Sequence, residues 1–366
     1  MSSILIMPTI KLYPEDFCVE EVIEIKHKKD DCLVFTLEKK NENTIDAIKK
    51  IAGILNLPFK NFGYAGLKDK NAVTRQKVSV KGIRKEDLEI ELENIKISDI
   101  EEGDRIKIGD HLGNKFKVVV RNVNTIEDIG EGFPNFFGEQ RLGGNEKIGY
   151  EILKGDYERA VKNLLIKEDM EEEIENEEFG KLLEKYPNTY EKRILKFLIR
   201  KKDYLKALRS LPFDILTLYI HAYQGFIFNE LLKKRLETLD LWEIEIGDII
   251  CSEKFEKKAY VKVNSSNIEE AREKRYPPVL PIVGYRTRVY GKTKEDLDLL
   301  LEKENMKLEY FKIKSIPFLS SRGTYREIIG RYENFNCKLE NNKLFCEFFL
   351  PKGEYATVFI DQLVKS

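Results

Sequence analysis

The chain has 366 residues, of which 42% are hydrophobic and 35% charged, and its 63 lysines and arginines nearly balance 64 aspartates and glutamates. The hydrophobic share excludes a wholly disordered chain. The net charge of −1 argues against a protein held on nucleic acid or membrane by bulk charge alone, and leaves room for a local basic groove.

Cysteine and histidine spacing argues against a metal site or a disulfide framework. The five cysteines form no CxxC pair, and the three histidines lie far apart in the sequence. No stretch approaches the ~18 apolar residues of a membrane span, and the first residues lack the apolar core of a signal peptide. We therefore expect a cytoplasmic protein with no metal and no membrane contact.

The first third of the chain is rich in predicted strands. Apolar and polar residues alternate along the first two strands. An amphipathic helix follows, in which isoleucines recur at helical spacing. After it come a third strand and a longer strand-rich stretch. In chain order the strands are 16–25 and 31–39, the helix is 44–57, and the later strands are 76–83 and 104–123.

The middle of the chain changes to helical periodicity. An acidic segment at 168–186 precedes a basic one at 190–211 and an apolar helix at 218–239. Strands return over 334–351, and a final helix is predicted at 354–365. Because strand-rich ends flank a helix-rich middle, we predict one domain built from both termini with a second domain inserted, about two domains for this length.

The stretch between the first helix and the strand at 76–83 fits neither period. It holds Asp69 between Lys68 and Lys70. Flanking cations favour the ionised carboxylate, which can then act as a nucleophile or a base. From these residues alone, an exposed charged hairpin is the simpler interpretation.

This segment resembles the signature of the TruD family of tRNA pseudouridine synthases, and five further segments resemble that family's motifs in the same order. The segments are KLYPEDFCVEE (11–21), GYAGLKDKNAVTRQ (63–76), LGNKFKVVVRNV (112–123), PNFFGEQRLGG (134–144), HAYQGFIFNELL (221–232) and LPKGEYAT (350–357). The last helix departs from the family pattern, since it reads FIDQL where a basic–acidic pair is usual before the leucine.

The resemblance implies the α+β pseudouridine synthase fold, with a large, mainly antiparallel mixed sheet. Residues 1–151 and 319–366 would form the catalytic domain, and 152–318 an inserted, helix-rich α/β domain. The implied reaction is the isomerisation of uridine to pseudouridine in tRNA, at U13 in the D-arm region, with no cofactor. Because the net charge is near zero, tRNA binding would require a basic cleft around Asp69 and acidic outer faces. We expect a monomer.

The resemblance also implies the roles of individual residues. Asp69 would be the essential carboxylate, with Lys11 as its basic partner. Phe137 would stack on the flipped uracil, and Asn135 would bind within the pocket. Phe17 and Glu20 would support the pocket from behind, while Gln140 and Arg141 would hold the loop or contact phosphate.

Two other functions are compatible with parts of this sequence. One is an RNA-binding or tRNA-folding protein on the same scaffold without chemistry, although such a protein would not need a carboxylate that repels phosphate. The other is a hydrolase or phosphotransferase with an aspartate nucleophile, but no DxD-type set of metal-binding carboxylates accompanies Asp69. If the protein is a pseudouridine synthase, Asp69 could attack the sugar, attack the base or remove a proton.

Overall fold

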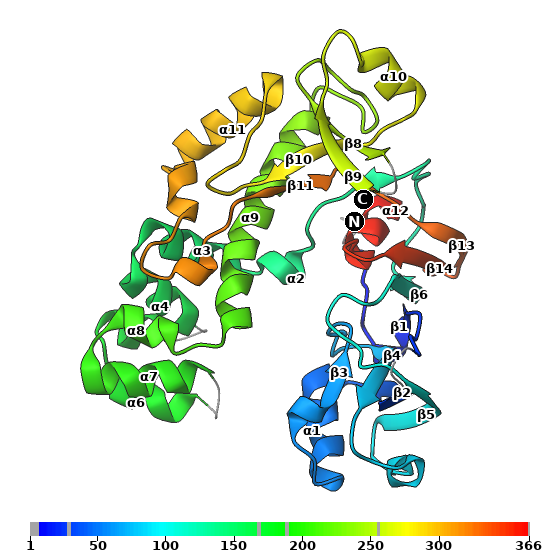
Figure 1. Cartoon of the computed structure of the whole chain (residues 1–366), viewed down its shortest axis with the longest axis vertical. Coiled ribbons are helices and arrows are strands. Elements are labelled where there is room, and N and C mark those ends of the chain that lie inside the picture. Colours follow the sequence, from blue (N-terminus) through cyan, green and yellow to red (C-terminus); the bar gives the residue numbers. More distant parts are fainter. Residues whose placement is uncertain (1–6, 28–30, 167–169, 187–189, 255–256, 365–366) are drawn as a thin grey trace, which may run out of the picture. The chain divides into compact units, whose positions relative to one another are not determined.

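The computed structural model describes residues 7–27, 31–166, 170–186, 190–254 and 257–364, with the backbone alone for residues 140, 141, 253, 254, 257 and 258. The chain divides into two compact units (Figure 1). The first comprises Met1–Phe133 and Gly330–Ser366, and the second Pro134–Ile329. The sequence placed the changes of domain at 151/152 and 318/319. The identity of the units as a catalytic and an inserted domain stays a prediction.

An eight-stranded sheet forms the first unit, in the order β13-β14-β6-β1-β4-β2-β5, with β3 paired to β4. The β1–β4 pair is parallel, whereas the other pairs described in this sheet are antiparallel. This mainly antiparallel, mixed sheet confirms the predicted fold class. The strands are β1 (Phe17–Val22), β2 (Cys32–Lys40), β3 (Phe62–Tyr64), β4 (Val73–Val80), β5 (Ile95–Gly103), β6 (Gly113–Arg121), β13 (Glu333–Glu340) and β14 (Lys343–Pro351).

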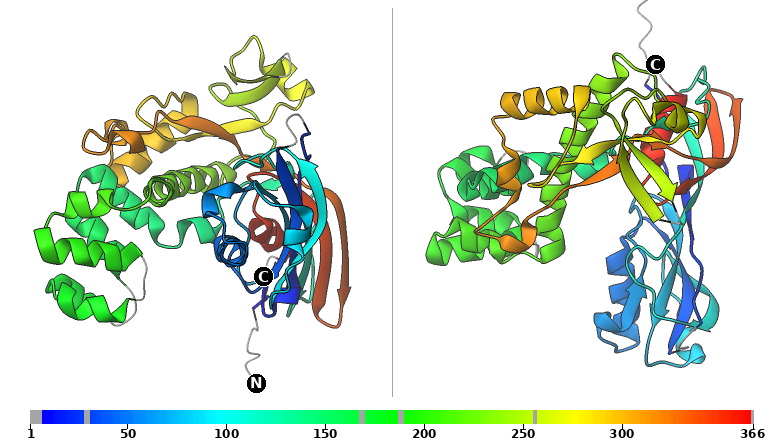
Figure 2. Two further views of the ribbon diagram at one scale, coloured as in Figure 1. Left: turned by 60° about the horizontal axis from the view of Figure 1, so that its bottom comes forward. Right: turned by 45° about the horizontal axis from the view of Figure 1, so that its top comes forward.

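Two helices cover one face of this sheet, α1 (Thr44–Ile54) and α12 (Ala356–Leu363). Figure 2 shows both on its concave side. The isoleucine stripe of α1 packs against the apolar stripe of β2, and Phe359 of α12 lies 4.5 Å from Phe348 of β14 between ring centroids. Helix α1 ends at Ile54, and Asn56, with φ 51°, adopts the left-handed conformation that commonly terminates helices.

The C-terminal strands form a tight hairpin. Glu340 pairs with Lys343, so Asn341 and Asn342 make a two-residue loop, and both have positive φ, 51° and 57°. Asparagine tolerates this left-handed conformation, and two such residues make the type I′ turn that matches strand twist. The strands predicted over 334–351 are confirmed.

The second unit combines helices with a four-stranded antiparallel sheet, in the order β11-β10-β8-β9. Its helices are α2 (Glu139–Leu142), α3 (Asn145–Lys154), α4 (Tyr157–Leu165), α5 (Glu171–Glu175), α6 (Phe179–Lys185), α7 (Tyr190–Lys201), α8 (Tyr204–Arg209), α9 (Phe213–Leu236), α10 (Ile268–Glu273) and α11 (Gly291–Lys303). Its strands are β8 (Ile249–Lys254), β9 (Lys257–Lys262), β10 (Pro278–Ile282) and β11 (Thr324–Glu327). Two short strands at the unit boundaries are β7 (Phe133–Pro134) and β12 (Ile329–Gly330).

Helix α9 is the longest, at 24 residues, and α3 packs directly on it. The two backbones meet at Gly149, where a Cβ atom would lie 2.0 Å from the carbonyl oxygen of Tyr219. Only glycine allows this approach, so the crossing of α3 and α9 is set by the absence of a side chain.

Candidate active site

Asp69 lies in the loop that joins β3 to β4, and its carboxylate is ion-paired. The Lys11 ammonium is 3.2 Å from Asp69 Oδ2, and the side chains of Lys11 and Asp69 are 14% and 29% exposed. The two residues are 58 positions apart in the chain. The structure thus brings together the aspartate and the lysine that the sequence singled out.

The segment that carries Lys11 is fixed from both sides. Lys11 has φ 58°, an uncommon conformation for a residue with a side chain. Before it, Thr9 exchanges two backbone hydrogen bonds with Arg121. After it, the Arg121 guanidinium binds both carboxylate oxygens of Asp16 at 2.8 and 2.9 Å, which lowers the pKa of that carboxyl. The buried Phe17 ring lies 4.1 Å below the Lys11 ammonium.

Three almost fully buried polar side chains hold the backbone of the Asp69 loop. Lys39 donates to Asp69 O at 2.8 Å, Thr44 Oγ1 accepts from Lys68 N at 3.0 Å, and Gln76 donates to Gly66 O at 3.0 Å. Thr44 also donates to Gln76 Oε1 at 2.9 Å. Because backbone groups of Gly66, Lys68 and Asp69 are bound in this way, the loop that presents the Asp69 carboxylate is held in place.

Lys39 is a residue that the sequence interpretation missed. It is 1% exposed, and burial lowers its pKa to about 8, against the opposing charge of Asp69. A signal for it was present: Leu33, Phe35 and Leu37 alternate along β2 on the face toward α1, and Lys39 continues that apolar stripe. A lysine on a buried stripe is rarely there for packing.

Strand β1 sends alternate residues to opposite faces of the sheet. Phe17 and Glu21 are buried on the face of the Asp69 loop. The Glu21 carboxylate pairs with Lys68 Nζ at 2.8 Å, and Lys68 also donates to Asn114 Oδ1 at 2.7 Å. Glu21 therefore supports the loop segment next to Asp69, a role the sequence interpretation did not assign.

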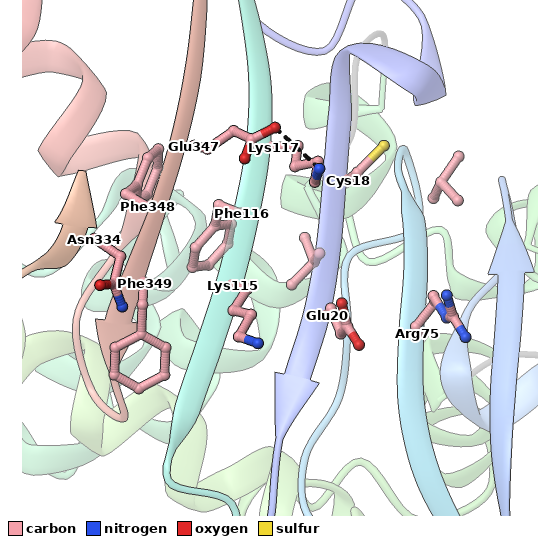
Figure 3. A pocket seen from close by; sticks show the side chains of 12 residues that line it. Cys18, Glu20, Arg75, Lys115, Phe116, Lys117, Asn334, Glu347, Phe348 and Phe349 are labelled. Carbon is pink, nitrogen blue, oxygen red and sulfur yellow. Dashed lines mark ion pairs between the residues drawn. The ribbon is translucent and has the colours of Figure 1, made fainter. Parts of the chain in front are cut away.

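Glu20 faces the other way. It is exposed, and its register partners are Arg75 and Lys115, which line the same shallow hollow of about 340 Å³ (Figure 3). Lys11, Phe17 and Asp69 do not line this hollow. The structure thus brings Phe17 to the Asp69 cluster and does not bring Glu20 there.

Asn135 belongs to a second cluster, in the second unit. Its backbone N–H donates to Ile328 O at 2.8 Å, and its amide Nδ2 donates to Glu327 O at 3.1 Å. Arg326 donates from Nε to Asn135 O at 3.3 Å and from Nη2 to Asn135 Oδ1. This buried asparagine is therefore clamped through its backbone and through both ends of its amide.

Phe137 is held two residues further on. The side chain of Asn229, on α9, accepts from Phe137 N at 2.8 Å and donates to Phe137 O at 2.9 Å. The Arg326 guanidinium stacks over the Phe137 ring at 4.4 Å, and Phe228 meets it edge-on at 5.4 Å. Arg326 thus contacts both Asn135 and Phe137, which the sequence interpretation did not foresee.

The remaining predicted residues are Gln140 and Arg141. Their backbone lies in the short helix α2, and their side chains lie outside the described part of the chain. In the described ranges, no three histidine, cysteine, aspartate or glutamate side chains are grouped so that they could hold a metal ion. Within those same ranges, no helix combines the length and apolarity needed to cross a bilayer.

Comparisons with known proteins agree with the resemblance. The model of the family "tRNA pseudouridine synthase D (TruD)" matches residues 5–363. A probable tRNA pseudouridine synthase D of Pyrococcus furiosus is 34% identical over 98% of this chain and 95% of its own, and one of Thermococcus sibiricus is 32% identical over 97% and 94%. A crystal structure from Methanosarcina mazei, assigned to TruD, matches with a TM-score of 0.76 at 27% identity and covers 98% of this chain and 93% of that one.

Proposed function

Since the chain belongs to the tRNA pseudouridine synthase D family, we propose that it isomerises uridine to pseudouridine in tRNA, at U13 in the D-arm region. The observation that carries this proposal is the ion-paired Asp69 on a loop held by buried side chains. A protein that only bound RNA would have no use for a carboxylate, which repels phosphate, at the centre of such an arrangement.

The reaction needs no oxidant, reductant or water. The bond between C1′ of the ribose and N1 of uracil breaks, the base turns, and C5 forms the new bond to C1′. The C5 proton is lost and N1 gains a proton, so atoms and charge balance. A single ionised carboxylate is the kind of group this chemistry requires, whether it acts on the sugar or on the base.

In this proposal the Lys11 ammonium keeps Asp69 ionised and oriented after RNA has displaced water, because a charge pair strengthens as the local dielectric falls. Phe17 supports that ammonium from below, and Lys39 holds the Asp69 backbone. These three residues position Asp69 and take no part in bond making.

Recognition of the base falls to the second cluster. Uridine in a stacked helix is inaccessible, so it must be flipped out, and an aromatic face repays part of the stacking energy. Phe137 supplies that face. Arg326 holds Phe137 and Asn135 in a fixed relation, and the Asn135 amide keeps capacity for one further hydrogen bond at each end.

The test is pseudouridine formation in unmodified tRNA transcripts, mapped by position, with wild type beside Asp69→Asn. The variant preserves the size of the side chain and removes its charge. We expect product at one D-arm uridine, its loss in the variant by at least about 10³-fold, and unchanged tRNA affinity. Asp99→Asn, at an exposed site on β5 in the same unit, is the matched control.

Wild-type protein that binds several tRNA transcripts tightly and forms no pseudouridine in any would favour the non-catalytic RNA-binding function. Product at a uridine outside the D-arm would keep the activity and overturn the assignment to U13.

A further inference from the structure

A pocket of about 410 Å³ lies in the second unit and has no part in the proposed reaction. It is lined mainly from α3, α4 and α9, and by Glu304 at the end of α11. Helix α3 packs against both α9 and α4 (Figure 1). Each of these three helices contributes residues about one turn apart. The residues that matter here are Glu146, Lys147 and Tyr150 on α3, Arg159 on α4, and Tyr223 and Phe226 on α9.

Two side chains that line this pocket each carry a buried polar atom with no hydrogen-bond partner among the described residues: the hydroxyl of Tyr223 and Oε2 of Glu146. Tyr223 is only 2% exposed. Burial, followed by the charge of Glu304 and the neighbouring Tyr150, raises the pKa of its hydroxyl, and both of those residues also line the pocket. A buried polar group without a partner is costly, so a ligand that satisfied both atoms would recover that cost on binding.

Aromatic rings form the apolar part of the pocket. Tyr223 stacks with Phe226 at 5.9 Å and 28° between ring planes, and Tyr150 meets Tyr223 edge-on at 5.6 Å. Tyr150 and Phe226 are both half-buried. Together they offer surfaces suited to a flat, aromatic ligand.

Charge is divided between the depth of the pocket and its rim. The carboxylate of Glu146 has its unpartnered oxygen buried, whereas Lys147 and the Arg159 side chain are exposed. Arg159 is also 3.6 Å from the mostly buried Glu151. An anion alone would meet carboxylates inside, so the geometry suits a ligand with hydrogen-bond donors at one end and negative charge at the other.

A guanine nucleotide has that combination. The guanine edge presents two adjacent N–H donors, which match the two oxygens of one carboxylate, and its carbonyl oxygen accepts from a hydroxyl. Uracil places carbonyl oxygens on both sides of its N–H, and those would face the carboxylate. The phosphate would lie at the rim, near Lys147 and Arg159.

We propose that this pocket binds a guanine base, with Glu146 accepting from its N–H edge and Tyr223 donating to its carbonyl oxygen. The source we infer is an unpaired guanosine of the RNA substrate, a choice that rests on the proposed function. Binding in a pocket of the helix-rich unit would help to select RNAs that expose such a base.

The first experiment measures guanine binding by calorimetry on the full chain. GMP is the probe, compared with IMP, which lacks one of the two donors, and with UMP. We expect GMP to bind about tenfold more tightly than IMP, because one hydrogen bond to a charged group is lost. Glu146→Gln should weaken GMP binding about tenfold and Tyr223→Phe about fivefold.

Tyr219→Phe is the matched control, since Tyr219 is buried one turn earlier on α9 and does not line the pocket. Tyr223→Phe removes a hydroxyl that has no partner in the described part of the chain, so the melting temperature of the variant should not fall. We therefore expect this variant to be folded, so that its GMP binding can be compared with that of wild type.

The second experiment measures kcat and KM for pseudouridine formation in tRNA with the same variants. We expect KM to rise in Glu146→Gln and Tyr223→Phe with kcat unchanged, no change in Tyr219→Phe, and competition between GMP and tRNA. GMP binding without that competition would keep the guanine site and overturn the RNA source. Unchanged GMP binding and unchanged KM in both pocket variants would overturn the proposal. Absence of pseudouridine formation by wild type would refute the proposed function alone, because the GMP titration does not depend on catalysis.

Discussion

The two clusters differ in how their central side chains are held. The Asp69 loop is bound through its backbone by side chains from β2, α1 and β4, and its carboxylate meets an ammonium from the N-terminal segment. Asn135 and Phe137 are instead clamped by Arg326, which lies 191 residues from Asn135, and by Asn229 on α9. The first arrangement places a charge, and the second places a ring and an amide. Disturbing the first should reduce turnover, and disturbing the second should weaken RNA recognition.

Among the residues that hold Asp69, Asn135 and Phe137 in place, the largest effect is expected from Lys11→Met, which tests whether the first cluster acts through charge. Removal of the ammonium 3.2 Å from Asp69 should lower kcat about 10²–10³-fold, the usual loss for one electrostatic partner at a reacting group. KM should change little. Lys70→Met, at an exposed lysine next to Asp69 in the chain, is the control. Equal losses in both variants would mean that general positive charge matters, and not this ion pair.

The second prediction concerns Lys39, whose buried ammonium should lower the free energy of unfolding of the folded protein. The folded pKa is about 8 and the ordinary value is 10.5. Between these two values the unfolded chain binds more protons, so stability should rise with pH. Below pH 8 the burial penalty is fully present. At 1.36 kcal/mol per pKa unit, the free energy of unfolding of wild type relative to Lys39→Met should increase by about 3 kcal/mol from pH 7 to pH 10.5.

Denaturant unfolding at several pH values checks this prediction, and the difference between the two proteins cancels the other titrating groups. A difference that stays constant across this range would show that Lys39 has an ordinary pKa in the folded protein.

Arg326→Lys probes the second cluster. Lysine cannot bind the backbone and side chain of Asn135 together while stacking on Phe137, because it lacks the planar fork of arginine. We expect KM for tRNA to rise about tenfold and kcat to stay within about threefold of wild type, in steady-state assays. Arg322→Lys, at an exposed arginine four residues earlier, should match wild type. A loss confined to kcat would contradict the proposal that the second cluster acts in RNA recognition while the first acts in turnover.

The smallest effect is expected from Asp16→Asn, which loosens the support of Lys11 indirectly. The charge-assisted bonds to Arg121 should be worth about 1–2 kcal/mol at pH 7. The folded pKa of Asp16 lies below its ordinary value of 3.8, so this stability is present above pH 4 and is lost as pH falls through the folded pKa. The free energy of unfolding should therefore differ less between wild type and Asp16→Asn at pH 3 than at pH 7, and unfolding measured at both pH values checks this.

Strand periodicity predicted much of the first unit. Alternation along β1 and β2 and the isoleucine spacing of α1 are local properties, and they follow directly from which face is buried. The alternation along β1 also predicts which residues share a face of the sheet, and the sequence interpretation did not use it. Phe17 and Glu21 lie on one face, whereas Glu20 points to the other. By contrast, β10 contains Pro278 and Pro281, which disfavour a strand, and it is a strand because it pairs with β8 and β11.

The sequence by itself determined the strand-rich ends around a helical middle, because periodicity within a segment is a local property. The α+β class, the role of Asp69 and its pairing with Lys11 came from the order of motifs that resemble those of the family, and not from periodicity. Only the tertiary structure decided that Lys39 holds the Asp69 backbone, that Arg326 joins Asn135 to Phe137, and that the second unit begins at Pro134. These features are contacts between residues distant in the chain, and their free energy is gained only when packing brings the partners together.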